Sequence, residues 1–297
     1  MWFKNLQIYT LPADWQATAD QVEEAVAKHP LLPVNQASMQ SHGWVPPAAG
    51  TGLAYRQGKH MLIALGIEQR ILPGSVINDE VKKKAAELEK EQGFAPGRKQ
   101  LRDLKDRVMD ELRPRAFIRK RTVRAWLDFE RRYFVIDSSS PRVAEDLCTV
   151  LRADLGDLPA VPMDTRQTPA AGMTGWVATG ESPPFFALQD TCELVADNIA
   201  KSNVRYQRHE LDGPEIRSLI SGGKTVARLG MVWHERVSMV LTDKAEVKRV
   251  RFVDVDEVST TTRPDADEFD ADFTLMTGEI ANLIGDLIGA LGGPRQP

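Results

Sequence analysis

The sequence predicts an α+β fold with mixed or antiparallel sheets, and three observations support this class. Segments with the branched and aromatic composition of strands are interspersed with amphipathic segments in no regular order, unlike the repeated strand–helix–strand unit of a parallel α/β fold. Residues 75–92 and 98–112 are charge-rich and carry one narrow apolar stripe each, which predicts a helical hairpin that projects from the body. Residues 273–291 predict a long C-terminal helix that ends at glycines and a proline.

Length and composition narrow the class of protein. The chain has 297 residues, enough for two or three compact units, and its 42% hydrophobic and 27% charged residues are ordinary globular values. No apolar run reaches the roughly 18 residues that span a bilayer, and the start lacks the layout of a secretory signal. Cys148 and Cys192 are too few for a disulfide framework and lack metal-ligand spacing. These features predict a cytoplasmic protein with no membrane partner.

The N-terminal half is predicted to alternate strands and helices irregularly. Residues 2–11 read as a strand, and 18–29 as a helix whose first turn Thr18 caps. The run MLIALGI at 61–67 indicates a buried strand.

Beyond the hairpin, strands and one helix are expected before a break. Residues 116–129 and 133–137 are predicted to be strands, and 140–156 a helix. The passage 159–184 is rich in proline and glycine and indicates a joint between domains. The remaining expected elements are a helix at 214–221 and strands at 185–190, 204–211, 225–233, 236–243 and 247–254.

Charge is strongly segregated along the chain. The formal net charge is −4, yet the basic stretch at 112–125, LRPRAFIRKRTVRA, has six cations and no acid: Arg113, Arg115, Arg119, Lys120, Arg121 and Arg124. Residues 254–286 are the reverse, with ten acidic residues and a single base, Arg263. Because the local field matters more than the sum, an acidic protein can still present a basic surface to a polyanion.

Two interpretations of the basic stretch are open. On a strand, Arg119 and Arg121 point to one face, while Lys120 and Arg124 point to the other, so both faces cannot be buried. The stretch is either a solvated edge strand or a surface that binds phosphates. Phe117 could stack or wedge, but the pattern first predicts that it anchors the strand in the core. Secondary candidates for phosphate binding are Lys82, Lys83, Lys84, Arg205 and Arg208.

No set of residues predicts catalysis. SGGKT at 221–225 lacks the first glycine of a phosphate-binding loop, and a strand rather than a helix is expected after it. The five histidines are scattered, and 265–272 lacks the glycine of a calcium loop. The sequence therefore predicts no enzyme activity, no metal site and no cofactor.

The C-terminal helix has an apolar heptad stripe with two possible partners. Its residues are Phe273, Met276, Ile280, Leu283, Leu287 and Leu291, and Ile284 and Ile288 widen it. The stripe can pack on the chain's own sheet, or it can form a symmetric contact between two copies.

Several stretches, in order and from end to end of the chain, resemble the recombination-associated protein RdgC family. They are WFKNLQIY at the start, GWVPP at 43–47, ILPGSVI at 71–77, RPRAF at 113–117, VAEDLCTVLRADLGDLPAVPM at 143–163 and FDADFTLMTGEIANLIGDLIGALGG at 269–293. The loop GFAPG at 93–97 departs from the family's lysine-rich pattern, so phosphate contacts are not expected from it.

The resemblance implies a ring-shaped homodimer, closed by two separate contacts, with a positive central hole that admits duplex DNA. It further implies association with the nucleoid and restraint of RecA-driven strand exchange. Phe117 is expected near one closure and the C-terminal helix at the other. The implied dimer residues are Phe117, Met276, Ile280, Leu283, Ile284, Leu287, Ile288 and Leu291.

Elements and resemblance together divide the chain into three parts. Residues 1–75 and 114–165 form a discontinuous central α+β domain, 76–113 a projecting tip, and 166–297 a base domain with the dimerising helix.

Three function hypotheses follow. The first is a non-catalytic protein that binds double-stranded DNA without sequence preference and limits recombinase access, with single-stranded DNA as an open second ligand. The second is a protein-interaction module that opposes a recombinase directly, with DNA binding secondary. The third, a nuclease, would require a metal-binding carboxylate cluster in a cleft.

Overall fold

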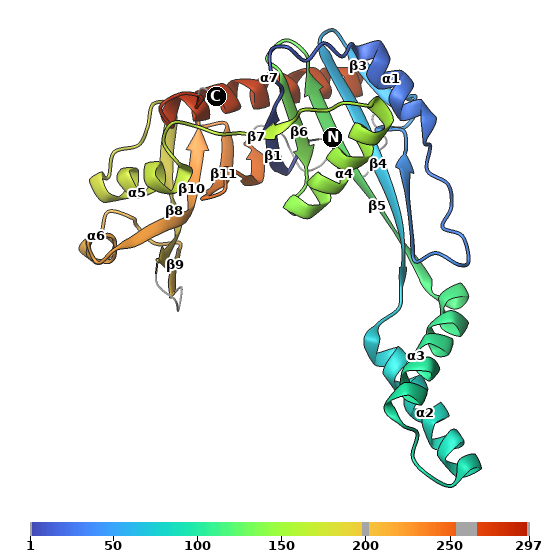
Figure 1. Cartoon of the computed structure of the whole chain (residues 1–297). Coiled ribbons are helices and arrows are strands. Elements are labelled where there is room, and N and C mark those ends of the chain that lie inside the picture. The colour runs from blue at the N-terminus through green and yellow to red at the C-terminus, as the bar shows by residue number, and fades with distance from the viewer. Residues whose placement is uncertain (1, 198–201, 254–265, 296–297) are drawn as a thin grey trace.

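The computed structural model describes residues 2–197, 202–253 and 266–295. The chain forms an arch (Figure 1). A long sheet makes the span, a helical hairpin descends from one end, and strand β9 with helix α6 descends from the other.

The sheet is antiparallel throughout, with the strand order β2-β4-β5-β6-β1-β12-β11-β10-β8-β9, while β3 adds to β4 and β7 to β1. This confirms the predicted α+β class. The strands are β1 (Asn5–Thr10), β2 (Gln40–Trp44), β3 (Ala54–Gln57), β4 (His60–Ile71), β5 (Phe117–Asp128), β6 (Tyr133–Asp137), β7 (Val161–Pro162), β8 (Phe186–Ala196), β9 (Asn203–Gln207), β10 (Lys224–Trp233), β11 (Val237–Thr242) and β12 (Val247–Phe252).

The helices flank this sheet. They are α1 (Ala19–Lys28), α2 (Gly74–Gln92), α3 (Arg98–Leu112), α4 (Pro141–Leu155), α5 (Pro169–Thr179), α6 (Pro214–Ser221) and α7 (Ala266–Ala290), with a 3₁₀ turn at Arg113–Arg115. Thr18 caps α1 in a capping box with Gln21, as predicted. Within the described residues, no helix is both long and apolar enough to cross a membrane.

Two cores lie on opposite faces of the sheet. Helices α1 and α4 bury residues such as Val22 and Leu147 against Ile63 and Val123. This side is called the α4 face. Helices α5, α6 and α7 bury their apolar residues on the other side, the α7 face, where Leu283 belongs to the same core as Met231 of β10.

The apolar stripe of α7 packs within its own chain. Met276, Ile280, Leu283, Ile284, Leu287 and Leu291 are at most 1% exposed, and Ile288 is half-buried. The expectation that these side chains form a contact between two copies is corrected for the six buried residues, because they already fill the core on the α7 face, and it remains a prediction for Ile288. A heptad stripe specifies burial but not the identity of the partner.

Other differences concern element boundaries. The expected joint at 159–184 contains α5, which Thr168 caps and Pro169 starts. Helix α7, Ala266–Ala290, includes residues 266–272, which precede the predicted helix. The sheet crosses the expected 165/166 boundary because Asn5 and Leu6 of β1 pair with Lys248 and Val247 of β12. The division into three domains remains a prediction. Four of the acidic residues lie outside the described residues: Asp254, Asp256, Glu257 and Asp265.

Strands β4 and β5 carry the hairpin. They pair along their full lengths, from His60 opposite Asp128 to Ile71 opposite Phe117, and helices α2 and α3 are inserted at that far end. Their distal halves, residues 66–71 and 117–122, are called the β4–β5 ribbon here. The six β5 residues of the ribbon are all exposed, so residues 117–122 of the basic stretch lie outside the core, and Phe117 does not anchor the strand there.

Candidate nucleic-acid interface

The ribbon presents two exposed arginines, Arg119 and Arg121, on its α4 face. Arg119 lies opposite Gln69, and Arg121 opposite Ile67, so both point to the same side as Val123, which belongs to the α4-face core. Both arginines are exposed, and neither has an ion pair or hydrogen bond within the described residues. These guanidinium groups are free to bind an anion from solvent.

The opposite face of the ribbon is neutralised internally. The Lys120 ammonium lies 2.8 Å from a carboxylate oxygen of Glu68, whose side chain is only 6% exposed. The Lys120 ammonium and then the Val34 backbone amide hold the pKa of Glu68 below its ordinary value. Arg124 is half-buried and donates from Nε to the Pro47 carbonyl oxygen at 2.9 Å. Lys120 and Arg124 are thus less available for phosphate than their place in the sequence implied.

The remaining residues of the basic stretch differ from each other. Arg113 donates to the Ala37 carbonyl oxygen at 3.2 Å and to Asp110 at 2.7 Å, which holds it at the base of the hairpin. The buried Arg70 donates to the Arg113 carbonyl oxygen at 3.0 Å and reinforces this junction. Arg115 is exposed and has no partner within the described part of the chain.

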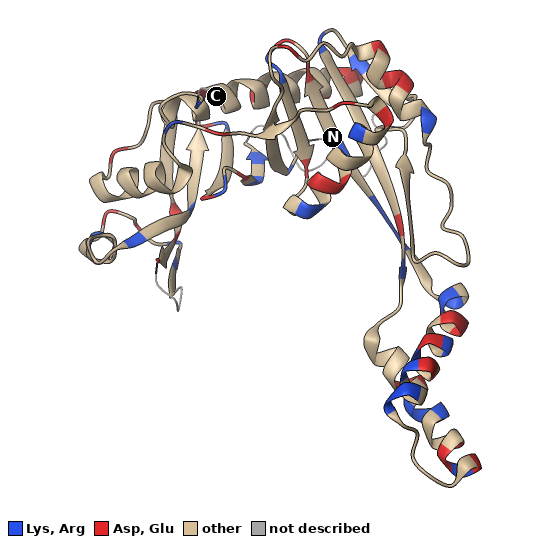
Figure 2. Cartoon of the chain, viewed as in Figure 1, with Lys and Arg blue, Asp and Glu red and all other residues tan. Residues whose placement is uncertain are grey.

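The lysines of the α2–α3 hairpin lie among side chains of both charges. Lys83 pairs with Glu80 at 3.3 Å and Lys84 with Glu111 at 2.5 Å, whereas Lys82 is exposed with no partner among the described residues. Figure 2 shows both signs of charge along α2 and α3. Exposed pairs of this kind contribute little, and the hairpin is not a uniformly basic surface.

One face of the base sheet, β8 to β12, is open to solvent. In β11, Val237 and Met239 are buried under α7 while Ser238 and Val240 are half-exposed, which is the alternation of a sheet packed on one side. This open sheet face continues the α4 face, because Lys248 lies opposite both Asn5 and Val240. Its basic residues are Arg205, Arg228, Lys248 and Arg251, which register with Glu193, Thr242, Val240 and Ser238.

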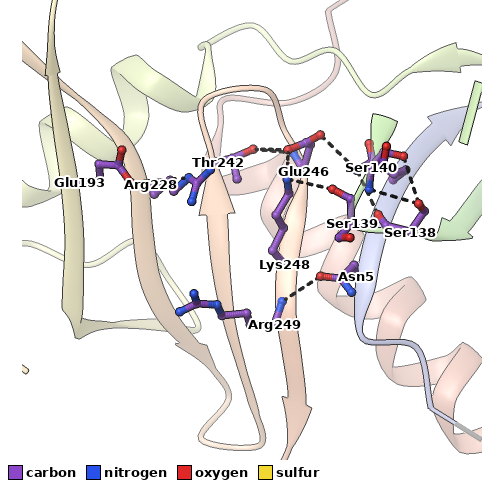
Figure 3. A network of polar contacts seen from close by, with 11 residues as sticks. Asn5, Ser138, Ser139, Ser140, Glu193, Arg228, Thr242, Glu246, Lys248 and Arg249 are labelled. Carbon is purple, nitrogen blue, oxygen red and sulfur yellow. Dashed lines mark hydrogen bonds and ion pairs between the residues drawn. The ribbon is translucent and has the colours of Figure 1, made fainter. Parts of the chain in front are cut away.

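A polar network joins the open sheet face to the central strands (Figure 3). Glu246, 8% exposed, accepts from Gln7 Nε2 at 3.1 Å and from Lys248 at 2.8 Å, and Lys248 also donates to the Ser139 carbonyl oxygen. Burial alone would raise the pKa of Glu246, but Lys248, Gln7 and Thr242 outweigh it and hold the pKa below its ordinary value.

A bulge in β12 displays a further arginine. Arg249 has a φ of 56°, and its amide donates to Asn5 Oδ1 at 3.4 Å. Its exposed side chain reaches across β11 (Figure 3). Such bulges re-aim a side chain and are frequent beside functional sites.

Among the candidates at the base, Arg205 is bound to Glu193 at 2.7 Å. Arg208 follows β9 with a φ of 54° and is exposed. Sequence reasoning missed Arg228, Lys248, Arg249 and Arg251. The available signal was the alternation of basic with apolar residues in TVARLGMVW and VKRVRF, which is the pattern of a sheet with one wet face.

The structure thus brings basic residues together on the concave side of the arch. Figure 2 marks Lys and Arg positions in blue on the base strands and on the ribbon. Within residues 2–197, 202–253 and 266–295, no group of three or more His, Cys, Asp or Glu side chains could hold a metal ion.

Comparison with known proteins finds one family model and many relatives that match this chain over nearly its full length. The matching family model is described as "RdgC: Putative exonuclease, RdgC" and covers residues 1–294. The "Recombination-associated protein RdgC" of Cupriavidus pinatubonensis (strain JMP 134 / LMG 1197) is 43% identical over 298 residues, covering 100% of both chains. The protein of the same name from Herminiimonas arsenicoxydans is 43% identical over 297 residues, covering 99% of both chains. The one from Dechloromonas aromatica (strain RCB) is 42% identical over 299 residues, covering 99% of this chain and 98% of the relative. The chain belongs to the RdgC family.

Proposed function

We propose that the chain is a non-catalytic protein that binds double-stranded DNA without sequence preference, closes a ring around it with a second copy, and limits the access of a RecA-type recombinase. The observation that carries the proposal is a pair of arginines, Arg119 and Arg121, that have no partner among the described residues and lie on the same sheet face as the basic residues of the open sheet face. Arginine matches phosphate oxygens with paired donors. Nucleoid association follows from the same binding.

The open sheet face explains why binding is expected to ignore sequence. Base edges are read by an element that enters a groove of the duplex. The open sheet face instead presents short side chains such as Ser238 and Val240 between the basic ones. Contacts of this kind reach the phosphate backbone, which carries no sequence information directly.

Affinity measured against salt tests the proposal. Duplexes of unrelated sequence should bind equally, and log affinity should fall linearly with log salt at a slope near −0.9 for each phosphate neutralised. A flat salt dependence, or strong preference for one sequence, would contradict it.

An exposed apolar patch at the end of the ribbon supports closure by a second copy. Phe117 is 85% exposed, and Ile71, which lies opposite it in the β4–β5 register, is 46% exposed. Large exposed apolar side chains in one place are typical of a contact surface, and a two-fold dimer would use the same patch from both copies.

If the protein closes into a ring, the time that it stays bound should depend on whether the DNA has free ends. The protein should stay on covalently closed circular duplex after a salt challenge but leave linear duplex of the same length, because only linear DNA has ends. Phe117→Glu should remove this difference, since it places a charge in the closing contact. Phe94→Glu, at an exposed phenylalanine in the hairpin loop, is the matched control and should retain it. Equal residence of the unmodified protein on both DNAs would argue against a ring.

The word exonuclease in the family description gives a further prediction. Linear duplex labelled at its ends should remain full length when incubated with excess protein and Mg²⁺ or Mn²⁺, with products resolved on a denaturing gel. Progressive shortening would contradict the non-catalytic proposal, provided that the protein preparation had first been shown to contain no contaminating nuclease.

A further inference from the structure

Glu193 lies between two arginines on the open sheet face. It is in the C-terminal half of β8, and the antiparallel register places it opposite Arg205 of β9 on one side and Arg228 of β10 on the other. Residues directly opposite in neighbouring strands have Cβ atoms about 5 Å apart, within reach of side-chain contact. Figure 3 shows Glu193 and Arg228 side by side on adjacent strands.

The contacts confirm that the Glu193 carboxylate interacts with both arginines. Oxygen Oε2 of Glu193 accepts from Arg205 Nη2 at 2.7 Å and from Arg205 Nε at 3.2 Å. The same oxygen lies 3.8 Å from Arg228 Nε. The other oxygen, Oε1, accepts from Asn203 Nδ2 at 3.5 Å. Hydrogen bonds from Arg205, and the nearby charges of Arg205 and Arg228, hold the pKa of Glu193 below its ordinary value against the opposing effect of burial.

The exposure of the three side chains is uneven. Glu193 is 13% exposed, while Arg205 and Arg228 are 49% and 46% exposed. The carboxylate is therefore more deeply buried than the two arginine side chains, whose other guanidinium nitrogens have no partner among the described residues. Two guanidinium groups converging on one anion is an arrangement that also suits a phosphate.

We propose that Arg205 and Arg228 form a phosphate site in which Glu193 is the resident anion, so that Glu193 sets the affinity of the open sheet face for DNA by competing with the phosphate backbone. This deepens the proposed function and rests on it. A phosphate arriving from solvent must share both arginines with a negative charge that is more deeply buried than they are.

Glu193→Gln tests competition because glutamine retains the shape and an acceptor oxygen for Arg205 while removing the charge. One additional phosphate neutralised should steepen the log–log salt slope by about 0.9 and tighten duplex binding roughly tenfold at 50 mM salt. Affinity is measured by fluorescence anisotropy with a labelled duplex across a salt series, and thermal melting checks that the variant is folded.

Two further comparisons make the result specific. Glu24→Gln on α1 removes the same charge from an exposed residue that has no partner within the described residues, and it should leave the slope unchanged. When Arg205→Gln and Arg228→Gln are both present, adding Glu193→Gln should no longer tighten binding, because the two arginines that would bind the phosphate are missing.

Three outcomes would overturn the inference. They are unchanged or weaker binding by a folded Glu193→Gln variant, an equal gain from Glu24→Gln, and a gain that persists without the two arginines. Failure of the proposed function is distinguishable, because the unmodified protein would then show no salt-dependent binding of duplex at all.

Discussion

Charge reversal of Arg119 and Arg121 is expected to abolish most duplex binding at moderate salt. Both guanidinium groups are exposed, without partners in the described part of the chain, and on the same face of the ribbon. Losing two phosphate contacts should flatten the log–log salt slope by about 1.8 and weaken binding on the order of a hundredfold at 0.1 M salt, with repulsion from the new carboxylates adding to the loss.

The matched control reverses two charges elsewhere. Lys59 and Lys244 are exposed and lie in the β3–β4 and β11–β12 turns, away from the ribbon. Lys59→Glu combined with Lys244→Glu makes the same change in net charge and should leave the slope near that of the unmodified protein. Equal losses in the two double variants would mean that overall charge, rather than the ribbon, governs binding.

The same variants separate occlusion from direct antagonism of a recombinase. If the protein limits strand exchange by covering DNA, inhibition should fall in proportion to affinity in Arg119→Glu/Arg121→Glu. Inhibition that persists while duplex binding is lost would favour the alternative, a protein-interaction module that contacts the recombinase.

Truncation of Leu283 is expected to cost about 2–5 kcal/mol of the free energy of unfolding, since it leaves a cavity in a closely packed core. The side chain is 1% exposed and belongs to the α7-face core with residues of β10 and β11. Urea unfolding followed by circular dichroism measures the loss.

Leu275→Ala provides the control on the same helix. Leu275 is 58% exposed, so its truncation should change the free energy of unfolding by less than about 0.5 kcal/mol. Equal stability of Leu283→Ala and Leu275→Ala would contradict the placement of the heptad stripe inside the chain.

Much of the fold could be predicted from local patterns in the sequence. The stripe in α3, the capping box at Thr18 and the apolar run of β4 each reflect periodicity or hydrogen bonding within a few residues. Helix α5 was missed because proline and glycine normally interrupt helices; here Pro169 occupies the first turn, and Gly172 lies against Leu291.

Pairing between distant residues limits what a sequence reveals about the site. The basic stretch stands out by composition, but Lys120 and Glu68 are far apart in the chain and meet only through the β4–β5 register. The same holds for Glu193 with Arg228. Which arginines remain free is therefore set by tertiary structure, even though the basic stretch itself can be found by inspection.

Site-specific photocrosslinking tests most directly whether duplex DNA lies on the concave side of the arch. A photoreactive residue would replace Gln69 on the ribbon, Val240 on the open sheet face, or the exposed Leu275 on the outer helix α7. Crosslinks to duplex from positions 69 and 240, with none from 275, are the predicted result. Efficient crosslinking from 275, or bound duplex that crosslinks from neither 69 nor 240, would contradict it.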